Sequence, residues 1–288
     1  MLALYGVDDV IRNLYCLARL QSAEAKITNT EELRHHYLSF LASRQPHAPV
    51  NWNDDVFVDD ERTEQRLSAA FSEGLLNDLG QADVFGPSYS EDIRQRKLSF
   101  ARKCVAELLH LDSDVDLVFG LVIHTIFLKA SKPSSSSRGS HGGSSSAAIG
   151  TIWLTVEDAL QRVDIMEMLV HELTHHLLFI DELNHAQFAY SEIAKPENFA
   201  RSAILKRNRP LDKVVHSIVV ATEILEARRK YLYGFGPSKI HPPSDALKQD
   251  TEMAIESVLT LPNLNDLITS HLREVLAKCT EVCCTVSA

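Results

Sequence analysis

Apolar residues recur at helical spacing over much of the first third of the chain. The pattern covers residues 10–20, 33–41 and 98–109, where apolar side chains fall three or four positions apart. Residues 45–62 are rich in Pro, Asn and Asp and interrupt this periodicity, which indicates a loop. The N-terminal region, residues 1–110, is therefore predicted to be helical.

A different pattern follows in the middle of the chain. Residues 115–130 are rich in Val, Ile, Leu and Phe, which predicts one or two buried strands, and residues 149–156 form a second strand-like run. Between them, residues 133–146 consist mostly of Ser and Gly, have little to bury and carry high backbone entropy. We predict that this segment is a long loop between antiparallel strands, with a lid over an active site as the alternative.

Helical periodicity returns in the last part of the chain. It covers residues 163–183, 211–231 and 254–278. The expected fold is a mainly helical α+β structure in which a small antiparallel sheet packs against the first of these helices, with the second helix opposite. Residues 111–288 are expected to form the catalytic region and to make one compact unit with residues 1–110.

Composition and charge exclude several classes of protein. The chain has 39 acidic and 29 basic residues and a formal charge of −10, which argues against a nucleic-acid partner. It contains neither a basic, apolar leader at its start nor an apolar run near the ~20 residues of a membrane helix, so we predict a cytoplasmic protein without a membrane partner. The odd number of cysteines does not fit a disulfide framework, and we expect no function for Cys279, Cys283 and Cys284.

The strongest chemical signal is the segment His171-Glu172-Leu173-Thr174-His175. Residues four apart on a helix lie on one face, so both imidazoles can share one metal ion. Glu172 points about 100° away around the helix axis, which suits a catalytic acid or base better than a ligand of the same ion. The motif lies in an apolar helix, where buried imidazoles need partners. We therefore predict a catalytic metal at His171 and His175.

A third ligand is expected from the helix at residues 211–231. His216 and Glu223 lie seven residues apart on one face of it, and sequence spacing does not separate them. Glu223 would complete a set of two histidines and a carboxylate, which suits zinc peptidases and iron oxygenases. Other polar residues near the motif are expected to be solvated or structural: His176, Glu182 and His185.

The region from Gly150 to about Leu232 resembles a bacterial family, the HExxH-motif peptide-modification proteins, which are 2-oxoglutarate-dependent peptide β-hydroxylases of ribosomal-peptide biosynthesis. Four features in sequence order carry the resemblance: the strand Ile149-Gly-Thr-Ile-Trp-Leu154, the motif within Leu169-Val-His-Glu-Leu-Thr-His-His-Leu-Leu178, the triplet Arg209-Pro-Leu211 and the following Val214-Val-His216. The Ser/Gly segment and the cysteine-containing tail depart from the family pattern.

The resemblance implies that His171, His175 and His216 bind Fe(II), with Glu172 matching the motif. It also implies that 2-oxoglutarate is the cosubstrate and that the substrate is a peptide, such as a ribosomally made precursor. Arg209 is the expected partner of the distal carboxylate of 2-oxoglutarate, because a guanidinium binds a carboxylate bidentately, and Arg207 is the reserve.

Two other functions stay open at this point. In the first, the chain is a zinc metallopeptidase with Glu172 as general base and Glu223 as third ligand. In the second, it is a peptide-binding protein without catalytic turnover. An intact set of ligand residues argues against this last interpretation.

Overall fold

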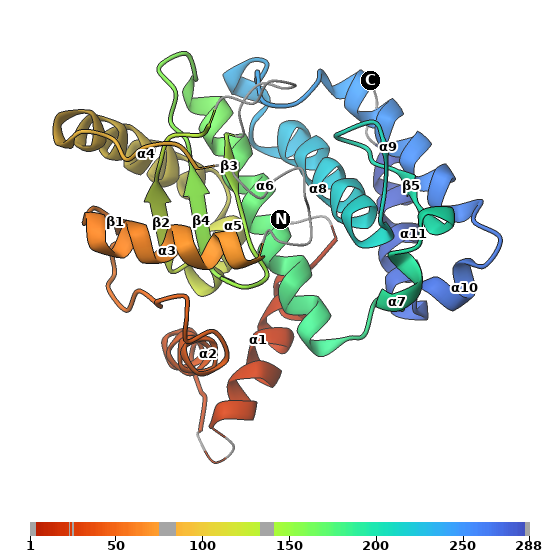
Figure 1. Cartoon of the computed structure of the whole chain (residues 1–288), viewed down its shortest axis with the longest axis horizontal. Coiled ribbons are helices and arrows are strands. Elements are labelled where there is room, and N and C mark those ends of the chain that lie inside the picture. The colour runs from red at the N-terminus through yellow and green to blue at the C-terminus, as the bar shows by residue number, and fades with distance from the viewer. Residues whose placement is uncertain (1–3, 23, 25, 75–84, 133–140, 286–288) are drawn as a thin grey trace.

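The computed structural model describes residues 4–22, 24, 26–74, 85–132 and 141–285 of the chain. It is a mainly helical α+β fold, as the sequence predicts (Figure 1). The helices expected in the N-terminal region are confirmed, and they are α1 (Val7–Gln21), α2 (Thr30–Arg44) and α4 (Glu91–Leu111). A further helix, α3 (Glu61–Gly74), begins at the end of the predicted loop.

The main sheet contains mostly parallel strands, so the prediction of an antiparallel sheet was wrong for most of it. The strands follow the order β1-β2-β4-β3 and comprise β1 (Phe57–Val58), β2 (Thr125–Leu128), β4 (Thr151–Leu154) and β3 (Gly142–Gly143). β2 pairs in parallel with both β1 and β4, and only β3 runs antiparallel to its neighbour β4. A parallel pair needs a long crossover, and the Ser/Gly-rich connection between β2 and β4 provides that length.

The strand β3 lies within the segment that we predicted as an unstructured loop. Gly142 fits there because an added Cβ would lie 2.9 Å from the carbonyl oxygen of Trp153 in β4. Residues 133–140 of the same segment lie outside the described residues. Because glycine has no side chain, β3 can pair closely with β4, although the composition of this segment suggested a loop.

The apolar run at residues 115–130 divides between a helix and a strand, which corrects the prediction of strands alone. Helix α5 (Ser113–Val122) begins after Asp112, whose side chain accepts hydrogen bonds from the backbone N–H groups of Asp114 and Val115. An uninterrupted apolar run is compatible with either a buried helix or a buried strand, and here the N-cap favours the helix.

The two long helices predicted around the metal motif are confirmed as α6 (Arg162–Asn184) and α8 (Leu211–Lys230). The helix predicted over residues 254–278 is divided, with Pro262 in the break. Three helices cover this part of the chain: α9 (Ser244–Leu259), α10 (Leu264–Leu267) and α11 (Ser270–Thr285). Short elements complete the fold: α7 (Tyr190–Ile193), η2 (Pro196–Asn198), η3 (Tyr233–Phe235) and the antiparallel pair β5 (Ala200–Arg201) and β6 (Asn208–Arg209).

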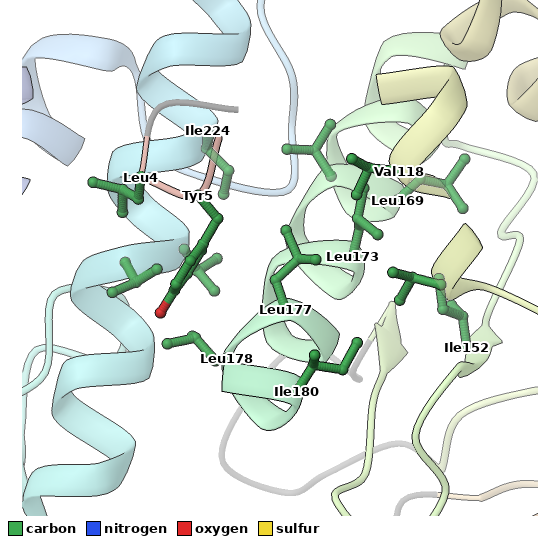
Figure 2. Packing of buried hydrophobic residues seen from close by; sticks show 14 of the residues in the cluster. Leu4, Tyr5, Val118, Ile152, Leu169, Leu173, Leu177, Leu178, Ile180 and Ile224 are labelled. Atoms are coloured by element: carbon green, nitrogen blue, oxygen red, sulfur yellow. The ribbon is translucent and has the colours of Figure 1, made fainter. Parts of the chain in front are cut away.

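Helix α6 lies at the centre of the molecule, between the sheet and α8. Figure 2 shows the leucines along α6, with Ile224 of α8 and Tyr5 on one side and Ile152 of β4 on the other. Leu169, Leu173 and Leu177 are almost completely buried. Burial of each such side chain contributes about 1.5–3 kcal/mol, which holds α6 in place between its neighbours. The main core extends from Leu4 to Cys283 and takes residues from both regions of the chain.

Among the described residues, no helix combines the length and apolar character needed to cross a bilayer.

Candidate metal centre

His171 and His175 lie one turn apart in the middle of α6. A capping box between Gln161 and Asp164 starts this helix, which fixes the register of the residues that follow. The Nε2 atoms of the two histidines are 3.1 Å apart. Two imidazole nitrogens bound to one ion at ~2.0–2.1 Å would be about 2.9–3.4 Å apart. The observed separation therefore fits a shared metal ion.

Both imidazoles are neutral at neutral pH. Burial lowers the pKa of His171 and of His175 well below its usual value, and the neighbouring histidines add to this effect. A neutral imidazole presents the lone pair that a metal requires. The pair is thus in the protonation state suited to metal binding.

Helix α8 places His216 beside this pair. Its Nδ1 lies 3.0 Å from Nδ1 of His175, and the two rings stack with centroids 5.3 Å apart. This contact involves the nitrogen of His175 opposite the one that faces His171. One ion can therefore take all three rings only after the ring of His175 or His216 turns about its χ2 torsion, which is a soft torsion for histidine.

The other possible third ligand, Glu223, is engaged with the N-terminal segment. Its Oε1 accepts a hydrogen bond of 2.8 Å from the backbone N–H of Leu4, and its charge raises the pKa of Tyr5 and of Tyr231. His171, Glu172 and His175 have ligand atoms that all lie within 4.8 Å of one another, and this group includes neither Glu223 nor His216. Of the two alternatives, His216 is the one seen in contact with the pair.

Glu172 lies at the edge of the histidine pair. Its Oε1 is 4.0 Å from Nε2 of His171, and its Oε2 accepts a hydrogen bond from Ser144 Oγ, just after β3. Burial raises the pKa of Glu172 and the hydrogen bond from Ser144 lowers it. The net result is a pKa of about 8. A nearby divalent cation would favour the ionised carboxylate instead. Glu172 can therefore hold or accept a proton near neutral pH beside a bound metal.

A fourth histidine, His241, contacts the site from the loop between α8 and α9. Its Nε2 lies 2.9 Å from Nδ1 of His171, and its Nδ1 lies 2.8 Å from Oε1 of Glu167. The guanidinium of Arg228 binds both oxygens of Glu167, at 2.7 and 2.8 Å. Burial alone would raise the pKa of Glu167, but hydrogen bonds from His241 and Arg228 lower it on balance. Glu167 is thus a buried carboxylate that orients His241.

This chain of contacts explains how His171 is oriented. If Nδ1–H of His171 donates to His241, and Nδ1–H of His241 donates to Glu167, then Nε2 of His171 keeps its lone pair toward His175. Metal-binding histidines commonly donate their second N–H in this way. Sequence analysis missed His241, because an isolated histidine before two prolines and 70 residues after the motif has no distinguishing spacing.

Charged residues of both signs lie near His216. Arg209, the residue predicted to bind 2-oxoglutarate, lies in β6 just before α8 and is half-buried. Burial lowers the pKa of His216 to about 4; the charges of Lys213 and Arg209 also lower it, and the charge of Asp212 raises it. These two cations therefore lie close to His216, whereas Arg207 is exposed.

His176 has a structural role and is completely buried. Its Nδ1 accepts a hydrogen bond from the backbone N–H of Gly150, and its Nε2 donates one to the carbonyl of Thr151. Both ring nitrogens are satisfied by the backbone, so His176 attaches α6 to the start of β4.

No family model matches the chain, and no curated protein matches it. The family resemblance therefore stays a prediction that depends on the quoted motifs and on the site geometry.

Proposed function

We propose that the chain is an Fe(II)- and 2-oxoglutarate-dependent oxygenase that hydroxylates a side-chain carbon of a ribosomally made peptide. His171, His175 and His216 would hold the iron, and Arg209 would bind the cosubstrate. The observation that supports this most is the position of His216 against His175, while Glu223 accepts a hydrogen bond from Leu4. This contrast favours a set of neutral imidazoles over one closed by a carboxylate.

The overall reaction consumes a peptide C–H bond, 2-oxoglutarate and O2, and it yields a peptide C–OH group, succinate and CO2. Iron would supply the redox chemistry that couples these events. Three protein ligands would leave open positions on the iron for the reactants. The distal carboxylate of 2-oxoglutarate needs a cationic partner, and Arg209 is a cation near His216, whereas Lys213 is paired with Asp212.

The sheet supports a peptide as the substrate. β3 is the last strand in the order β1-β2-β4-β3, and it is followed directly by Ser144, the partner of Glu172. An extended peptide can bind by adding a strand to the edge of a sheet. A peptide paired with β3 would pass next to Glu172 and the histidines.

The proposal is tested by metal analysis after anaerobic purification, followed by measurement of succinate formed from 2-oxoglutarate under O2. We expect stoichiometric iron and succinate formation in the wild-type chain. His216→Ala should lose both. Glu223→Gln is the matched control on the same helix, because its amide oxygen can still accept from Leu4, and it should retain both. Iron binding and succinate formation that survive in His216→Ala would contradict the proposal.

A second function, a zinc metallopeptidase, is favoured by one observation. Glu172 combines a buried position beside His171 with a pKa raised to about 8, which suits a general base. Under this alternative, Glu223→Gln loses zinc, and Glu172→Gln lowers peptide hydrolysis by roughly 10²–10⁴-fold. The same variants therefore separate oxidation from hydrolysis.

A further inference from the structure

A second group of ligand-type side chains lies at the C-terminal end of α6. Asp181 and His185 are four residues apart, and His271 comes from the first turn of α11. One ligand atom from each of these residues lies within 4.8 Å of the other two. His271 Nε2 is 2.8 Å from Asp181 Oδ2, and the rings of His185 and His271 have centroids 4.3 Å apart. The spacing of four residues between Asp181 and His185 repeats that between His171 and His175.

The charge of Asp181 is the first reason to expect a cation here. Its carboxylate is 2% exposed. It accepts hydrogen bonds from uncharged donors: Tyr5 Oη, Asn13 Nδ2 and Gln187 Nε2. Within the described part of the chain, no lysine or arginine forms an ion pair with it, and the nearby side chains that can carry a positive charge are the histidines His271 and His185. A buried carboxylate is costly unless it meets a cation, and metal coordination meets that need.

Gln187 provides a second and independent reason. Its Oε1 is buried and has no hydrogen-bond partner among the described residues, while its Nε2 donates to Asp181. Buried polar atoms without partners are rare in folded proteins. The oxygen and nitrogen of a side-chain amide exchange places when the group flips. A cation beside Asp181 would favour the flipped amide, with Oε1 toward the metal.

We propose that Asp181, His185 and His271 bind a second divalent transition-metal ion, of which Zn²⁺ is the best match. One carboxylate and two imidazoles are a donor set that this ion accepts, and the exposed His185 keeps the site open to solvent. The ion would connect α11 to α6. Tyr5 and Asn13, which also contact Asp181, would be ordered with them. This site therefore stabilises the ends of the chain and is separate from the catalytic centre.

The test measures Zn²⁺ binding calorimetrically in a chain that carries His171→Ala and His175→Ala. Binding at the first pair is removed in this background, so failure of the proposed function leaves the result unaffected. We expect one equivalent of Zn²⁺ to remain bound. Adding His185→Ala or His271→Ala should weaken this binding at least tenfold. His110→Ala, which changes an exposed histidine on α4, is the control and should leave the affinity unchanged.

A second measurement covers the case in which the double variant fails to fold. His185→Ala in the wild-type chain changes an exposed residue just after α6, and circular dichroism reports whether the helices remain. We expect the Zn²⁺ stoichiometry to fall by one equivalent and the rise in Tm with Zn²⁺ to decrease. An unchanged stoichiometry in a folded His185→Ala chain would overturn the proposal. So would the absence of any Zn²⁺ binding in a folded double variant.

Discussion

Two pairs of potential metal ligands lie along helix α6, His171 with His175 near its middle and Asp181 with His185 at its C-terminal end. Both pairs have the same spacing of four residues, and each meets a histidine from a distant helix. The first pair consists of neutral imidazoles, and Glu167 and Arg228 orient it through His241. The second combines a buried carboxylate with an exposed imidazole.

Helical spacing thus brings two potential ligands together but does not set their chemistry. A metal held by neutral imidazoles keeps its full positive charge, which suits binding of anionic cosubstrates and activation of a reactant. A metal on a buried carboxylate is partly neutralised and compensates a charge of the protein. This difference in charge is the basis for proposing a catalytic metal at the first pair and a stabilising metal at the second.

Loss of Arg228, which acts on His171 through Glu167 and His241, should lower the free energy of unfolding more than the other changes considered below. Arg228→Ala should destabilise the chain by about 3–5 kcal/mol in urea unfolding, because Glu167 is fully buried and would lose its guanidinium partner. Arg229→Ala is the matched control, since Arg229 is about half exposed and pairs with Glu226. It should cost less than about 1 kcal/mol. Equal effects of the two variants would show that Glu167 does not depend on Arg228.

A smaller loss of folding stability is expected when the pH is lowered. Burial lowers the pKa of His124, whose Nε2 lies 3.1 Å from the carbonyl oxygen of Ile149, to about 4. In the unfolded chain this imidazole titrates near ~6.5, so the unfolded state binds the proton first as the pH falls. The contribution of His124 to stability is present above pH ~6.5 and is lost as the pH falls toward ~4, on the order of 3 kcal/mol in total.

Unfolding of the metal-free protein across this pH range tests the prediction. His124→Gln, in which no imidazole titrates, should reduce the slope of stability against pH relative to the wild-type chain. When the slopes of stability against pH are compared between the two chains, the constant cost of the substitution and the titration of Glu172 cancel. Parallel curves would contradict the assignment to His124.

A change in metal affinity, smaller in free energy than the effects above, distinguishes the pair His171 and His175 from the pair Asp181 and His185. His241→Gln should lower the metal affinity of the first pair by about 10–100-fold, because His171 loses the partner that orients its ring. Affinity at Asp181, His185 and His271 should stay constant, since His241 contacts none of them. Competition with a chelator in single-site variants measures both affinities. Equal losses at both sites would indicate a general effect on folding.

Local sequence signals predicted most of the helices and the position of the motif. Periodic apolar residues and a spacing of four between His171 and His175 act within one helix, so they can be read along the chain. The same signals failed where two structures satisfy one pattern. The apolar run at residues 115–130 became α5 and β2, and the direction of β2 and β4 depended on pairing between distant segments.

The helical framework and the candidate ligand pair His171 and His175 could be predicted from the sequence, because both depend on neighbours within a few turns. The contacts of His216 with His175, of Glu223 with Leu4, and of His241 and His271 with α6 are visible only in the folded chain. These contacts join residues far apart in the chain. Only the burial of α6 between the sheet and α8 brings them together.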